Sequence, residues 1–137
     1  MTQPVLAAGL VHSESMTVAE RHTVPCVAPD WPGFANMPPV LATAMMIGFI
    51  EQTCIQALRP YLEPGQRTVG THVDVSHVAA TPIGMAITAS IELVQVEGRM
   101  LVFQVSCHDK AGLIGEGTHQ RAIIDLERFL QKLEQKS

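Results

Sequence analysis

The stretch LATAMMIGFIEQTC, residues 41–54, is strongly apolar yet carries one carboxylate, Glu51. Burying an ionised carboxylate without partners costs on the order of several kcal/mol, so proteins normally exclude or pair such a group. The pattern predicts a helix over about 40–58, which places Thr43, eight residues earlier, along the same side as Glu51. Glu51 therefore either faces water or a surface arginine, or something in the fold requires it.

A histidine is the second candidate for chemistry. In VGTHVDVSHVAA, residues 69–80, period-two alternation predicts a strand with one mostly apolar face. That face would contain Val69, Thr71, Val73, Val75, His77 and Ala79. If it meets the helix, His77 points toward the element that bears Glu51, and an inward histidine and glutamate form an acid/base pair. The alternative is a core histidine whose ring is satisfied by backbone groups.

A third cluster lies in GEGTHQR, residues 115–121, where His119 and Arg121 share one strand face. Gly115 and Gly117 permit a bulge or a close backbone approach. Arg121 either is solvated or faces an anion and orients the site. The sequence has no H-E-x-x-H, no G-x-S-x-G and no P-loop, so we expect neither a metal nor a separate cofactor.

The elements that must position these residues follow from periodicity and from glycine and proline breaks. We predict one or two short strands over 16–28, a loop without regular structure over 29–39, and the helix over 40–58. Four longer strands over 68–80, 84–97, 99–109 and 113–126 follow, then a short amphipathic helix over 127–136. The domain organisation is a flexible tail, 1–15, and a single α+β domain, 16–137. Because the helix is apolar nearly all round, we expect a second subunit to cover it, giving at least a homodimer.

Composition sets the broad class. The chain has 137 residues, 47% hydrophobic and 16% charged, which fits one globular domain. Its formal net charge of −4 argues against nucleic acid as a partner. Three scattered cysteines form no disulfide framework and favour the reducing cytoplasm, and no segment reads as a signal peptide or a membrane span.

Several of these blocks together resemble one family. VLATAMMIGFIEQTC, RPYLEPGQRTVGTHVDVSHVAATPIG, VEGR and IGEGTHQRAIIDLERF follow, in order and spacing, the fluoroacetyl-CoA thioesterase group of the hot-dog superfamily. The resemblance extends from about residue 18 to 136. It implies a hot-dog fold, in which an antiparallel sheet wraps a long central helix, and a dimer that hydrolyses an acyl-CoA thioester.

The resemblance also implies roles for particular residues. The family's helix threonine and glutamate and its strand histidine fall on Thr43, Glu51 and His77, with Glu51 as base or nucleophile, His77 as acid/base and Thr43 orienting. A pocket glycine falls on Gly70 and a nearby arginine on Arg121. Where the fluoroacetyl-specific member has a phenylalanine before the helix, this chain has Met37, so we expect a small-to-medium acyl group and weak preference for fluoroacetyl.

The expected function is therefore hydrolysis of an acyl-CoA thioester, with coenzyme A entering only as part of the substrate. Two alternatives stay open from the residues. One is a hot-dog hydratase or dehydratase of enoyl- or hydroxyacyl-CoA, which would also pair a histidine with a carboxylate. The other is a dimer that binds acyl-CoA without turning it over.

Overall fold

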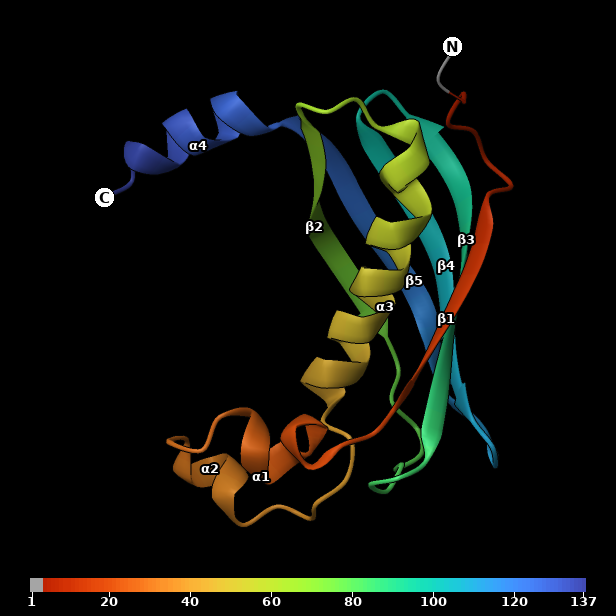
Figure 1. Cartoon of the computed structure of the whole chain (residues 1–137), viewed down its shortest axis with the longest axis vertical. Coiled ribbons are helices and arrows are strands. Elements are labelled where there is room, and N and C mark those ends of the chain that lie inside the picture. The colour runs from red at the N-terminus through yellow and green to blue at the C-terminus, as the bar shows by residue number, and fades with distance from the viewer. Residues whose placement is uncertain (1–3) are drawn as a thin grey trace.

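The computed structural model of the protein describes residues 4–137. Five antiparallel strands form one sheet in the order β1-β3-β4-β5-β2. Their bounds are β1 Val11–Thr17, β2 Gln66–Val75, β3 Ala86–Glu97, β4 Met100–Asp109 and β5 Gly112–Asp125. The sheet curves around a long helix, α3 Thr43–Leu58 (Figure 1). This is the predicted α+β hot-dog arrangement, and the four longer strands and the helix lie close to their predicted positions.

Helix α3 is held by one apolar stripe. Met46, Ile50, Cys54 and Leu58 recur at every fourth residue and are at most 1% exposed. They pack with buried side chains of the central strands, among them Phe103. The opposite side of α3, which includes Thr43, Ala44, Gly48, Gln52 and Ile55, is exposed in the single chain. The sheet thus covers only one side of a helix that is apolar nearly all round.

Two segments before α3 differ from the prediction. The segment 16–28 was expected to form short strands, but only its first two residues belong to β1, and the rest forms a short 3-10 helix, Glu20–His22, and α1 Val24–Val27. The segment 29–39, expected to lack regular structure, contains the one-turn helix α2 Pro32–Ala35. In α1 and α2 a proline stands at the start of the turn, where its fixed φ suits a helix and no N–H is needed.

The two ends of the chain frame this body. Strand β1 begins at Val11, so the sheet starts inside the stretch 1–15 that was assigned to a tail; residues 1–3 of that stretch lie outside the described residues. At the other end, the predicted amphipathic helix is α4 Leu126–Glu134. No helix within residues 4–137 is long and apolar enough to cross a membrane.

Strand β2 contains a bulge that decides which side chains face α3. Gly70 pairs with Arg121 and His72 with Gln120, so Thr71 is an extra residue without a partner on β5. Side chains directly opposite each other in a ladder share a face. Before the bulge the face toward α3 carries Gly70, and after it Val73, opposite His119. The predicted alternation was therefore right for Val73 and Val75 and wrong for Val69 and Thr71, and the predicted strand residues 76–80 lie beyond the end of β2.

The glycines of β5 allow β2 to end close to that strand. An added Cβ at Gly117 would overlap the carbonyl oxygen of Asp74, and one at Gly115 would overlap that of Ser76. Beyond the end of β2, the backbone N–H groups of Ser76 and Val78 still donate to β5 carbonyls, at 2.9 and 2.7 Å. The predicted close backbone approach is confirmed, and it fixes the position of His77 between these two bonds.

The remaining elements project from one side of the body. In Figure 1, α1 and α2 lie at the Thr43 end of α3 and α4 lies at the other end, all extending past edge strand β2.

Candidate active site

Glu51 is held by a buried arginine. It lies in the middle of α3, and its Oε2 accepts a hydrogen bond of 2.8 Å from Nη1 of Arg121, which projects from β5. The Glu51 side chain is 37% exposed, whereas that of Arg121 is 3% exposed. Arg121 therefore faces an anion, as one of its two predicted roles required, and is not solvated. The anion is the carboxylate of Glu51.

Arg121 is fixed from two further directions. Its Nε and Nη2 donate to the hydroxyl and carbonyl oxygens of Thr68 on β2, both at 2.9 Å. Its Nη1 also donates to Nε2 of His119 at 3.1 Å. Four of the five N–H groups of the guanidinium thus have acceptors, which leaves it a single orientation. Thr68 and His119 were not predicted as site residues. The sequence feature that could have identified them is their spacing: Thr68 is two residues from Gly70 and His119 two residues from Arg121, so each shares a strand face with a predicted site residue.

Gly70 leaves room for this carboxylate. A Cβ at this position would lie 2.7 Å from Oε2 of Glu51 and 3.3 Å from Cε1 of His119. Because real Cβ atoms do not approach an oxygen that closely, a side chain at residue 70 would displace the carboxylate. The predicted Gly70 is therefore in contact distance of the candidate site.

Thr43 and His77 form a second pair. Oγ1 of Thr43, in the first turn of α3, lies 2.7 Å from Nδ1 of His77. Nε2 of His77 is buried and has no hydrogen-bond partner among the described residues. Burial lowers the pKa of His77, an effect that a hydrogen bond with the backbone at Ala79 partly opposes. The ring is therefore neutral at pH 7.

Within one chain, the two pairs are separate. Thr43 and Glu51 are eight residues apart, or about 12 Å along a regular helix. Within residues 4–137 no hydrogen bond or ion pair joins His77 to Glu51, so the expected pairing of these two groups is not formed in the protomer. Thr43 contacts His77 instead of Glu51, and the histidine is the group that it orients.

Met37 lies in the segment between α2 and α3 and is 49% exposed. The aromatic rings of the same region, Trp31 and Phe34, stack edge to face with centroids 5.2 Å apart. These three residues belong to α2 and the residues on either side of it, and α2 lies at the end of α3 where that helix begins (Figure 1).

The cysteine nearest the site is not a nucleophile. Burial raises the pKa of the Cys54 thiol to about 12, so it is protonated at neutral pH. Nor do the described residues bring together three or more histidine, cysteine, aspartate or glutamate side chains that could hold a metal ion.

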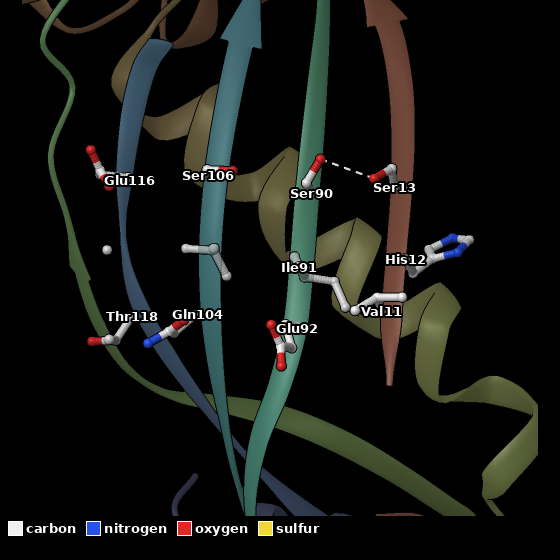
Figure 2. A pocket seen from close by; sticks show the side chains of 12 residues that line it. Val11, His12, Ser13, Ser90, Ile91, Glu92, Gln104, Ser106, Glu116 and Thr118 are labelled. Carbon is white, nitrogen blue, oxygen red and sulfur yellow. Dashed lines mark hydrogen bonds between the residues drawn. The ribbon is translucent and has the colours of Figure 1, made fainter. Parts of the chain in front are cut away.

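A separate hollow lies on the outer face of the sheet, away from α3. Figure 2 shows it bordered by polar side chains of β1, β3, β4 and β5, with a hydrogen bond of 2.9 Å between the hydroxyls of Ser13 and Ser90. It is open and has a volume of about 740 Å³. Its lining contains none of the predicted site residues.

Two solved structures of low sequence identity define the fold. The chain matches a hypothetical thioesterase-superfamily protein of Thermus thermophilus with a TM-score of 0.83 at 23% identity, covering 98% of this chain and 97% of that one. It also matches a hot-dog-like protein of Thermanaerovibrio acidaminovorans, with a TM-score of 0.80 at 19% identity over 94% and 91% of the two chains. The chain therefore has the hot-dog fold.

Closer relatives define the family. The model of the fluoroacetyl-CoA-specific thioesterase family, FlK, matches residues 14–127. The fluoroacetyl-CoA thioesterase of Streptantibioticus cattleyicolor is 46% identical over 91% of this chain and 90% of its own length. A solved structure of the fluoroacetyl-CoA thioesterase FlK superimposes with a TM-score of 0.95 at 43% identity, covering 98% and 99% of the two chains. The chain belongs to the fluoroacetyl-CoA-specific thioesterase family and is a thioester hydrolase.

Proposed function

We propose that this protein hydrolyses a small-to-medium acyl-CoA thioester to the carboxylate and free coenzyme A, with no cofactor beyond the coenzyme A of its substrate. The observation that carries the proposal is Glu51, a partly exposed carboxylate in an apolar helix whose one oxygen is fixed by the buried Arg121. Such an arrangement presents the second oxygen in a defined direction. A family whose relatives act on fluoroacetyl-CoA supports the substrate class.

Glu51 acts on the thioester carbonyl in one of two ways. As a base, it takes a proton from water, and the resulting hydroxide adds to the carbonyl carbon and expels the thiolate of coenzyme A. As a nucleophile, it adds to the carbonyl carbon itself and expels the thiolate of coenzyme A, forming a mixed anhydride that water then hydrolyses to regenerate Glu51. In both routes the reacting oxygen is Oε1, because Oε2 accepts the hydrogen bond from Arg121.

His77 and Thr43 serve the leaving group and the developing negative charge. When the Thr43 hydroxyl donates to Nδ1 of His77, the ring proton resides on Nε2, the atom that is buried without a partner. A neutral imidazole with a free N–H can donate to the carbonyl oxygen during attack and protonate the departing sulfur. In this tautomer the Thr43 hydroxyl holds Nδ1, and the Nε2–H group is left for the reaction.

We further propose that the protein is at least a homodimer that joins the two pairs across its interface. The support is three features of the described residues: one face of α3 is exposed, β2 is an edge strand, and Val73 on it is 42% exposed. An uncovered apolar helix face and a free strand edge are surfaces that a second copy would bury. Thr43 and His77 of one chain would then meet Glu51 of the other.

The cross-chain site is tested by mixing two impaired variants, Thr43→Ala and Glu51→Gln, and letting their subunits exchange. In a mixed dimer, one of the two sites keeps both side chains, so a random equimolar mixture should regain about a quarter of the unaltered activity. Each variant mixed with itself is the control. Subunit exchange without any return of activity would show that the site is complete within one chain.

The hydrolysis is tested with a panel of acyl-CoA thioesters, measuring thiol release by the unaltered protein and by Glu51→Gln. The amide preserves volume but is neither base nor nucleophile, so we expect a folded protein with at least a 1,000-fold lower kcat, about 4 kcal/mol of lost transition-state stabilisation. Turnover of the variant at the unaltered rate would remove Glu51 from the mechanism. A change in the absorbance of an enoyl-CoA without thiol release would indicate a hydratase. Binding of acyl-CoA without turnover would indicate a dimer that only binds acyl-CoA.

We also propose a cytoplasmic location. Cys26, Cys54 and Cys107 are all free thiols, which suits a reducing compartment.

A further inference from the structure

We propose that His119 is a positioning residue of the hydrolytic site, acting through Arg121 on the Glu51 carboxylate. The inference rests on the role proposed above for Glu51. It begins from the position of His119, which lies on β5 two residues before Arg121 and is only 1% exposed. A buried imidazole needs partners for both ring nitrogens, and the identity of those partners fixes which nitrogen carries the proton.

The tautomer of His119 follows from its two neighbours. Nδ1 lies 2.8 Å from the backbone carbonyl oxygen of His72, which can only accept, so Nδ1 carries the proton. Nε2 lies 3.1 Å from Nη1 of Arg121, which can only donate, so Nε2 presents its lone pair. Burial lowers the pKa of His119, which keeps the ring neutral, as this pattern requires.

The effect on Glu51 comes from the single nitrogen that serves both groups. Nη1 of Arg121 has two N–H bonds: one is directed at Nε2 of His119 and the other at Oε2 of Glu51. Because the guanidinium is planar, fixing one N–H direction fixes the other. His119 therefore aims the donor that holds Glu51, while its own Nε2 stays 3.9 Å from Oε2 and does not contact it at hydrogen-bond distance.

The bulge in β2 gives this arrangement its anchor. His72 is the first paired residue after the unpaired Thr71, and its carbonyl oxygen accepts the hydrogen bond from Nδ1 of His119. Bulges commonly redirect side chains beside active sites. A chain of hydrogen bonds thus runs from the β2 backbone through His119 and Arg121 to the Glu51 carboxylate. Each N–H group in this chain has one acceptor.

The test compares two side chains of similar length at this position, His119→Gln and His119→Met. Glutamine offers an amide oxygen to Arg121, whereas methionine fills the space with only a weakly accepting thioether. We expect His119→Met to lower kcat about 100-fold with KM unchanged, and His119→Gln to stay within about tenfold of the unaltered protein. Methionine is the more easily buried of the two, so a residue needed only for packing would give the opposite order.

Thermal unfolding of both variants supplies the structural control, and His119→Asn replaces His119→Met if that variant does not fold. Its shorter amide can still donate to the His72 carbonyl, but it does not reach Arg121. Equal kcat values for the glutamine variant and its non-accepting counterpart, or a lower value for glutamine, would overturn the proposal. Failure of the proposed function gives a different result. If the proposed function is wrong, Glu51→Gln remains active; if only the positioning role is wrong, Glu51→Gln is inactive and the His119 variants do not differ as expected.

Discussion

Substituting Gly70 with alanine should reduce catalysis while leaving the fold intact. The new Cβ would lie 2.7 Å from Oε2 of Glu51, and ordinary contact begins at 3.4 Å, so the oxygen has to move about 0.7 Å. It is the end of a flexible side chain and can move at little cost to folding. The hydrogen bond from Arg121, 2.8 Å long in the unaltered protein, is lengthened or broken by that shift.

The magnitude follows from the size of the displacement. Misplacing a reacting group by about 1 Å can lower the rate about 100-fold, so we expect kcat to fall between about 10-fold and 100-fold. Stability should change by less than about 1 kcal/mol, because replacing glycine restricts the unfolded chain while a partly exposed ion pair weakens. The assay is thiol release from the best acyl-CoA of the panel, together with denaturant unfolding of the same samples.

Two controls separate this mechanism from others. Gly65→Ala is the matched variant, since a Cβ there meets no atom within 4 Å; its kcat should be unchanged. In the Glu51→Gln background, Gly70→Ala should cause no further loss of residual activity, because the displaced group is already inactive. If Gly70→Ala lowers activity by the same factor in both backgrounds, Gly70 acts on the substrate and the reasoning from the carboxylate is wrong.

Three further predictions follow from the same geometry. His77→Ala should lower kcat by about 100-fold or more and alter its pH profile, and Thr43→Val should do the same more weakly; a change in melting temperature alone would make His77 a core residue. Met37→Phe should raise the kcat/KM ratio of fluoroacetyl-CoA to acetyl-CoA, by up to about 100-fold, since one apolar contact changes selectivity by about 1–3 kcal/mol; a several-thousand-fold preference in the unaltered protein would show that Met37 is not the relevant difference. Because burial lowers the pKa of His22, His77 and His119 in the fold, the unfolded chain binds more protons as pH falls below about 6.5. The free energy of unfolding should therefore be highest above about pH 7 and should decrease toward pH 5.5, and the decrease should be smaller in His119→Gln. Denaturant unfolding measures it, and a free energy that does not change over this pH range would contradict the prediction.

Much of the fold could be predicted from local patterns. The long strands show alternating apolar and polar residues or end at glycine-containing turns, and α3 is indicated by an apolar run that follows Pro39. Their positions therefore follow from periodicity and from glycine and proline breaks. The short helices before α3 could not be predicted in this way. One turn contains too few residues to show a period, and the prolines that indicate a break also begin a helical turn.

The sequence by itself determined which residue types are available for chemistry: an apolar helix with one glutamate and one threonine, and strands carrying His77, Gly70 and Arg121. The tertiary structure decided how these residues are grouped. Gly70 and His77 are seven residues apart, and in a regular strand an odd separation would put them on opposite faces. The unpaired Thr71 reverses the alternation between them, so that both face α3. A bulge is set by the pairing of β2 with β5 across more than forty residues of chain, and no local pattern contains that information.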